Sequence, residues 1–146
     1  MYKAALLAVA IVAQPVADHG LPAISASAFR CMVANVYHEA RGEGKAGMAA
    51  VAQVTVNRAT KGKTVCSVVY AHKQFSWANT AKGRSKAMTG DIEPVLVAAY
   101  QALAGAVQDA TEGATHYHAT CVKPVWAKHM VKTKQIGNHI FYKVIK

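Results

Sequence analysis

The chain has 146 residues, of which 53% are hydrophobic and only 16% are charged. This balance favours one globular domain and excludes a disordered chain. The formal net charge is +10, and such a surface would attract a polyanion by long-range steering. Nucleic acid, anionic lipid and the bacterial envelope all qualify, and a basic surface that only maintains solubility is equally common.

The amino terminus resembles an export signal. Lys3 precedes an apolar stretch at residues 4–13, which is too short to span a bilayer but suits a secretory leader. Ala26-Ser27-Ala28 then fits a cleavage site. We therefore expect a leader and connector over residues 1–28, a functional domain over 29–146, and export to the periplasm or wall. Transient membrane contact would come from the leader, and a short N-terminal core helix is the alternative.

In chain order, apolar residues at helical spacing predict an amphipathic helix over residues 28–40. A run rich in alanine and valine predicts a second helix over residues 46–59. Residues 65–70 are rich in β-branched side chains and fit either a short strand or a helical turn. Residues 78–90 are basic and polar and predict an exposed loop.

Asp91 and Pro94 predict the start of another helix, because an acidic residue and a proline both suit a first turn. This helix is expected to run to about Val107. From Gly113 onward, and again over residues 140–145, the composition favours extended structure. Helices first and short strands last predict an α+β fold, mainly helical with a small antiparallel sheet.

The chain has three cysteines, Cys31, Cys66 and Cys121, whose spacing matches no zinc module. Buried free thiols are the commonest explanation. Export would allow one disulfide, and all three pairings are open.

The carboxylates single out one candidate for chemistry. Four of them bracket the helix that begins near residue 91 and are explained by capping, charge and solvation: Asp91, Glu93, Asp109 and Glu112. Glu39 instead falls at the rim of an apolar stripe, in the last turn of its helix. Burial and the helix dipole should both raise its pKa, which is what protonating a glycosidic oxygen requires. The alternative is a structural ion pair with Arg41.

Glu43 follows four residues later and would lie near Glu39 only if the helix continued. Two adjacent carboxyl groups would form a retaining pair, but Gly42 argues against a continued helix. Glu43 is therefore expected to shape the loop or to contact substrate.

Histidines offer an alternative based on a metal. His116 and His118 would share one strand face, and His139 could join them. His38-Glu39 also begins a zincin-like motif, but Gly42 stands where the second histidine is required. Because scattered histidines are usually polar core or surface residues, we predict no metal and no cofactor.

Aromatic side chains lie next to hydrogen-bonding ones at three places in the sequence. This mixture suits sugar rings, which have apolar faces and polar edges, although most aromatic residues simply pack in the core. The candidate substrate-binding residues are Glu43, Gln74, Ser76, Trp77, His116, Tyr117 and Trp126.

Taken together, these segments resemble the spore-cortex-lytic, or SleB-type, cell-wall hydrolases, which also occur among bacteriophage endolysins. The matching segments are residues 36–43, 50–58, 65–70, 74–77, 113–118 and 136–142, with Pro124 and Trp126. They follow the family's order and cover about residues 30–143. Glu-Ala-Arg-Gly-Glu at 39–43 and Gln-Phe-Ser-Trp at 74–77 are specific in combination. One departure is the short, basic segment between Trp77 and Asp91.

The resemblance implies a compact domain akin to lysozymes and lytic transglycosylases, with Glu39 as catalytic acid. It further implies cleavage of peptidoglycan between N-acetylmuramic acid and N-acetylglucosamine, by lytic transglycosylase or muramidase chemistry. We expect a monomer that binds no nucleic acid. Two alternatives stay open: a metal-dependent wall amidase or peptidase using His116, His118 and His139, and a non-catalytic basic module that binds nucleic acid or the envelope.

Overall fold

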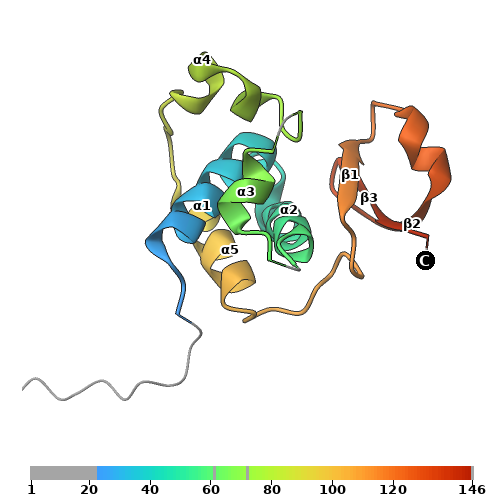
Figure 1. The fold of residues 1–146 in the computed structure, drawn as a ribbon, viewed down its shortest axis with the longest axis horizontal. Coiled ribbons are helices and arrows are strands. Elements are labelled where there is room, and N and C mark those ends of the chain that lie inside the picture. Colours follow the sequence, from blue (N-terminus) through green and yellow to red (C-terminus); the bar gives the residue numbers. More distant parts are fainter. Residues whose placement is uncertain (1–22, 61, 72, 146) are drawn as a thin grey trace, which may run out of the picture.

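The computed structural model describes residues 23–60, 62–71 and 73–145. Its α-helices precede its strands (Figure 1). The elements are α1 (Ala26–Ala40), α2 (Gly44–Arg58), α3 (Val65–Val69), the 3-10 helix η1 (Trp77–Asn79), α4 (Ala81–Arg84), α5 (Glu93–Leu103), β1 (His116–Ala119), the 3-10 helix η2 (Val125–His129), β2 (Met130–Ile136) and β3 (His139–Val144). The α+β prediction is confirmed.

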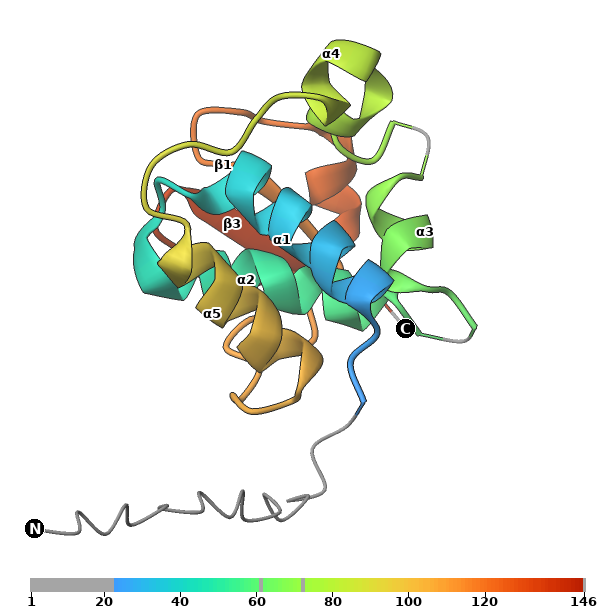
Figure 2. The same cartoon turned by 90° about the vertical axis from the view of Figure 1, so that its left-hand side faces the viewer.

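Helix α2 is the centre of the molecule, with α1 and α5 on one side and the strands on the other (Figures 1 and 2). Val51 and Ala52 of α2 pack in the core shared with α1 and α5, while Ala50 and Val54 pack against Phe141 of the sheet. Because both sides of α2 are covered, its sequence is rich in small and apolar residues and has no wide polar stripe.

The three strands form an antiparallel sheet in the order β1-β3-β2. Tyr117 of β1 lies opposite Phe141 of β3, which directs Tyr117 toward α2 and the end of α1. Strands β2 and β3 are joined by a tight turn at Gly137, whose φ of +55° favours glycine. The expected small antiparallel sheet is therefore present.

Two predicted helices are correct to within a few residues. Helix α1 begins at Ala26, and Ser25 caps it by accepting a hydrogen bond from the Ala28 amide at 3.1 Å.

The predicted cleavage site, Ala26-Ser27-Ala28, is the first turn of α1. Residues 1–22, which carry most of the predicted leader, lie outside the described residues. None of the described helices is long and apolar enough to cross a membrane.

Three segments differ from or refine the predictions. Residues 65–69 are helical, with Thr64 accepting a hydrogen bond from the Ser67 amide. Helix α5 ends at Leu103 rather than near Val107, because Gly105 takes a left-handed conformation with φ +63°. The expected loop over residues 78–90 is largely exposed but includes the short helix α4, which Thr80 caps.

A disulfide joins Cys31 of α1 to Cys66 of α3, with a Cα–Cα distance of 5.3 Å. Because α1 packs against α3, the two cysteines face each other. Cys121 is free and exposed. The interpretation of the cysteines as buried free thiols was therefore wrong.

Candidate active site

Glu39 lies in the last turn of α1, where helix, strand and the end of α2 meet. The Tyr117 hydroxyl donates a hydrogen bond to Glu39 Oε2 at 3.1 Å. Burial raises the pKa of Glu39 by more than the Tyr117 hydrogen bond and the nearby Arg58 charge lower it. The side chain therefore keeps its proton to a higher pH than an exposed glutamate does.

Tyr117 holds Glu39 in one orientation. Burial, followed by the neighbouring Glu39 carboxyl, raises the pKa of Tyr117 well above its ordinary value of 10.0. The hydroxyl thus stays protonated and acts as a permanent donor to Oε2. Within the described part of the chain no group donates to Glu39 Oε1, so this oxygen is free to carry the acidic proton.

Arg58, the last residue of α2, is a member of this site that the sequence reasoning did not assign. Its Nε donates a hydrogen bond to the Thr115 carbonyl oxygen, just before β1. Its guanidinium lies 5.7 Å from the centre of the Phe75 ring. Burial lowers the pKa of Arg58, whereas Tyr117 and Glu39 raise it. The available signal was the only arginine of a helix rich in alanine and valine, at the end of that helix.

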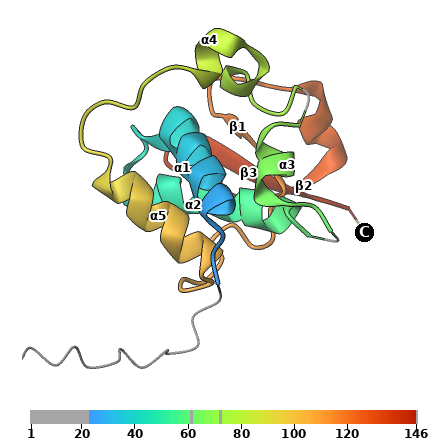
Figure 3. The same ribbon diagram turned by 60° about the vertical axis from the view of Figure 1, so that its left-hand side comes forward.

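Three adjoining hollows form one groove through Glu39. The middle hollow, of about 220 Å³, is lined by Glu39, Arg58, Lys73, Gln74, Phe75, His116, Tyr117 and Trp126. A hollow of about 630 Å³ shares Arg58, Gln74 and His116 with it. On the other side, a hollow of about 370 Å³ shares Glu39 and continues past Trp77 and α4. We call the three together the groove; its lining includes residues at the end of α1 and in α4. Figure 3 shows the positions of these two helices.

The groove gathers most of the predicted site residues. Besides Glu39 itself, six candidates line it: Gln74, Ser76, Trp77, His116, Tyr117 and Trp126. They come from the segment leading into η1 and its first residue, from β1 and from η2, which are far apart in the chain. Their convergence around one buried acid is what a site for an extended ligand requires.

Glu43 is the candidate that the structure places elsewhere. Helix α1 ends at Ala40. A carboxylate pair with Glu39 would have required this helix to continue through Glu43, so no such pair is expected. The Asn138 amide in the β2–β3 turn donates to Glu43 Oε2 at 2.9 Å. A Cβ at Gly137 would lie 2.8 Å from the same oxygen. The turn therefore closes directly onto the Glu43 carboxylate.

A tryptophan stands on each side of Glu39. Trp77 stacks on His38 with ring centres 4.5 Å apart and planes inclined by 24°. The centre of the Trp126 ring lies 5.5 Å from that of His116 and 5.6 Å from that of His118. This confirms that the two histidines share one face of β1. Apolar ring faces bordered by hydrogen-bonding groups suit a chain of sugars.

The histidines do not gather into a set of metal ligands. Both ring nitrogens of His118 are engaged: Nδ1 lies 2.8 Å from the Ala119 carbonyl oxygen and Nε2 lies 3.0 Å from the Tyr142 hydroxyl. Over residues 23–60, 62–71 and 73–145, no group of three or more His, Cys, Asp and Glu side chains is close enough to hold a metal ion. The metal-dependent alternative gains no support from this donor set.

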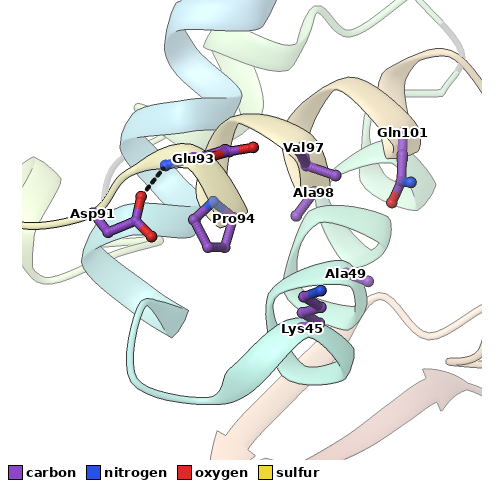
Figure 4. Close-up of a pocket in the computed structure, with 8 residues that line it drawn as sticks. All are labelled: Lys45, Ala49, Asp91, Glu93, Pro94, Val97, Ala98 and Gln101. Atoms are coloured by element: carbon purple, nitrogen blue, oxygen red, sulfur yellow. Dashed lines mark hydrogen bonds between the residues drawn. The ribbon is translucent and has the colours of Figure 1, made fainter.

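A further hollow, of about 470 Å³, lies between α2 and α5 (Figure 4). It has two carboxylates, but Asp91 accepts a hydrogen bond from the Glu93 amide at 3.0 Å and so starts α5. Lys45 and Gln101 also line it. None of the predicted site residues lies here. Size alone therefore does not identify the active site.

Comparison with known proteins agrees with this geometry. Residues 42–142 match the model of the Cell Wall Hydrolase family. The fold is similar to the catalytic domain of the Bacillus cereus SleB protein, with a TM-score of 0.70 and 30% identity over 84% of this chain and 94% of that one. It is equally similar, at 0.70 and 30%, to the catalytic domain of the germination-specific lytic transglycosylase SleB from Bacillus anthracis, over 84% of this chain and 98% of that one. Among proteins with curated descriptions, none matches. The chain therefore belongs to the SleB-type cell wall hydrolase family.

Proposed function

We propose that this protein cleaves peptidoglycan glycan strands as a lytic transglycosylase, with Glu39 as the single catalytic acid. One observation carries the proposal: a half-buried glutamate with a raised pKa lies midway along a groove walled by two tryptophans. The name of the Bacillus anthracis relative, a germination-specific lytic transglycosylase, supports the same reaction class.

In the proposed reaction, Glu39 Oε1 gives its proton to the oxygen between N-acetylmuramic acid and N-acetylglucosamine. As this bond breaks, positive charge develops on the muramoyl ring. Tyr117 continues to donate to Oε2 and stabilises the carboxylate that forms. The Glu39 carboxylate then takes the proton of the muramoyl 6-hydroxyl while that oxygen bonds to C1. A 1,6-anhydro end results, and Glu39 is protonated again.

The groove favours internal attack by the substrate over a carboxylate nucleophile. Among the described residues that line it, Glu39 is the only one with a carboxyl group. Glu43 is bound to the Asn138 amide, so it is not available as a second carboxylate. The second reacting group must then come from the substrate or from water.

We also propose that the protein acts outside the cytoplasm. The Cys31–Cys66 disulfide supports this location, because disulfides persist mainly in oxidising compartments. Peptidoglycan lies in the same place. The leader predicted over residues 1–28 would provide the route.

Glu39→Gln tests the proposal, because it keeps the side chain's size and removes its acid. Glu93→Gln on α5, outside the groove, is the matched control. We expect Glu39→Gln to lower the rate of wall clearing by about 10²- to 10⁴-fold, the usual contribution of a general acid. Glu93→Gln should stay within about twofold. Near-native clearing by Glu39→Gln would disprove the assigned role.

Mass spectrometry of the digested wall identifies the bond and the product. Lytic transglycosylase chemistry predicts muropeptides with 1,6-anhydro ends. Reducing ends instead would show water attack and a muramidase. Release of new amino groups that stops when metal ions are chelated would show the metal-dependent amidase. No products of any kind, with DNA binding that weakens steeply with salt, would show the non-catalytic alternative.

A further inference from the structure

Positive charge is concentrated along the groove. Six basic side chains line its three hollows: Arg41, Arg58, Lys63, Lys73, Lys82 and Lys86. The hollow beside Trp77 contains Arg41, Lys82 and Lys86 together with Ser76 and Thr80. We call Arg41, Lys82 and Lys86 the basic rim. Burial lowers the pKa of the His38 imidazole, and the nearby charges of Arg41 and Lys86 lower it further.

The basic rim has no carboxylate partner in the part of the chain that the structure describes. The one ion pair found there joins Lys134 to Glu112, with 3.7 Å between Nζ and Oε1. Three other carboxylates have partners elsewhere: Glu43 binds Asn138, Asp91 starts α5, and Asp109 accepts hydrogen bonds from Thr111 and Gly113. Glu39 is the only acidic side chain among the described residues that line this hollow, and none of the three cations forms an ion pair with it. Three neighbouring cations repel one another, and an anionic ligand would relieve this repulsion.

The fold holds the basic rim in place. A Cβ at Gly83 would overlap the Trp77 carbonyl oxygen, so only glycine lets α4 lie directly against Trp77. Arg84 Nη1 donates to the Ala78 carbonyl oxygen at 2.8 Å, which fixes α4 to η1. Lys82 lies beside Gly83 in α4, and Lys86 follows α4 directly. Both lysines therefore project from a fixed turn at the edge of the groove.

Arg41, the third member, is anchored from the α1 side. Its Nη1 donates to the Tyr37 carbonyl oxygen at 3.1 Å, and its guanidinium lies 4.7 Å from the centre of the Tyr37 ring. Arg41 and α4 thus face the same hollow from two sides, next to the acid Glu39. An anion bound here would be attached to the sugar whose bond Glu39 protonates or to its neighbour.

Resting on the proposed function, we propose that the basic rim binds the carboxylates of the stem peptide on the muramoyl residue. The enzyme would therefore prefer peptide-bearing strands. The sugar rings of the strand are neutral, and its negative charges lie on the lactyl-linked peptides. Sugar rings would stack along Trp77 and Trp126, while the peptide leaves the groove between Arg41 and α4.

The test compares Lys82→Gln/Lys86→Gln with Lys132→Gln/Lys143→Gln. Both variants lose two positive charges, but Lys132 and Lys143 are exposed on β2 and β3, outside the groove. On intact walls at low salt, we expect kcat/KM of the rim variant to fall about five- to tenfold with kcat nearly unchanged. The control should change less than twofold. Added salt should reduce the difference, because exposed charges are screened.

Two modified substrates locate the anion. Amidation of wall carboxylates with a carbodiimide and ammonia should lower the wild-type rate to that of the rim variant and abolish the difference between them. Strands stripped by an amidase keep only the lactyl carboxylate. If the rim variant is still selectively impaired on them, the lactyl group is the ligand and the stem-peptide proposal is overturned. Equal losses for the rim and control variants on intact walls would also overturn it.

Binding separates failure of this proposal from failure of the proposed function. Each charge variant is combined with Glu39→Gln, and co-sedimentation with intact and amidated walls is measured. Weaker binding of the rim variant to intact walls alone supports the proposal even if no glycan bond is cut. Binding equal to that of the control overturns it, even if Glu39 proves to be catalytic.

Discussion

Two glutamates four positions apart in the sequence lie in opposite surroundings. Glu39, at the end of α1, faces the groove and receives one hydrogen bond, from the Tyr117 hydroxyl, whose pKa burial raises well above its ordinary value. Glu43, before α2, faces the β2–β3 turn and receives a hydrogen bond from a main-chain amide. The end of α1 thus holds a buried acid that favours its neutral form, whereas the start of α2 holds a carboxylate that fastens the sheet to the helices.

The comparison shows that the partner, more than the residue type, decides the role. The main-chain amide of Asn138 holds the Glu43 carboxyl against the β2–β3 turn, which makes Glu43 a structural anchor. Glu39 is half-buried and accepts a hydrogen bond from the Tyr117 hydroxyl alone, so it remains able to exchange its proton. Four predictions test the difference between the region around Glu39 and the region around Glu43.

The largest effect concerns the anchoring of α1, which carries both Cys31 and Glu39. The disulfide closes a loop with a sequence separation of 35, for which chain entropy predicts a stabilisation of about 4 kcal/mol. Cys31→Ala/Cys66→Ala should lose this amount in denaturant unfolding. Cys121→Ala, at an exposed free thiol, should change stability by less than about 0.5 kcal/mol. Equal effects of the two variants would contradict the anchoring role.

Removal of the Glu43 anchor should lower stability without changing the chemistry. Glu43→Ala loses the charge-assisted bond to the Asn138 amide, at a cost of about 1–2 kcal/mol. Glu43→Gln keeps an acceptor and should lose less. Rates measured well below the melting temperature should stay within about threefold. A loss of activity as large as that of Glu39→Gln, in a folded protein, would show that Glu43 takes part in the reaction.

Loss of the Tyr117 hydroxyl should affect Glu39 but not Glu43. The Tyr117 hydrogen bond lowers the pKa of Glu39, so Tyr117→Phe should raise that pKa further. The alkaline limb of the kcat profile should then move to higher pH, because it reports deprotonation of the acid. We also expect about a tenfold lower kcat, because the carboxyl is less firmly positioned. An unshifted alkaline limb would mean that Tyr117 only packs.

The smallest effect is the pH dependence of stability. Because the folded state raises the pKa of Glu39, the folded protein binds this proton more tightly than the unfolded chain does. Stability from this group is therefore present below the unfolded pKa, about 4.3, and is lost as pH rises through the folded pKa. Glu39→Gln should be more stable than wild type at neutral pH, by a margin that shrinks on acidification. Thermal unfolding across pH 3–8 measures this margin, and a constant margin would contradict the buried-acid description.

The sequence predicted helices best in segments long enough for the helical spacing of apolar residues to repeat over several turns. Residues 28–40 show several turns of apolar spacing, so α1 was predicted to within two residues of its start at Ala26. Residues 65–70 are too few to show a period, and only packing of α3 against α1 and α2 decides that they are helical. The end of α5 was misplaced because the sequence does not show that Gly105 takes a positive φ.

The features of the site also divide into those that the local sequence predicted and those that only the tertiary structure decided. Composition and helical spacing alone determined that Glu39 sits at a half-buried helix end in a basic chain, since both follow from local geometry. Only the tertiary structure decided which groups surround it. Tyr117 and Arg58 reach Glu39 from β1 and α2, and Glu43 turns away because Asn138, 95 residues later, binds it. Such contacts depend on chain segments that meet only after α2 is covered on both sides, and local sequence patterns carry no information about that meeting.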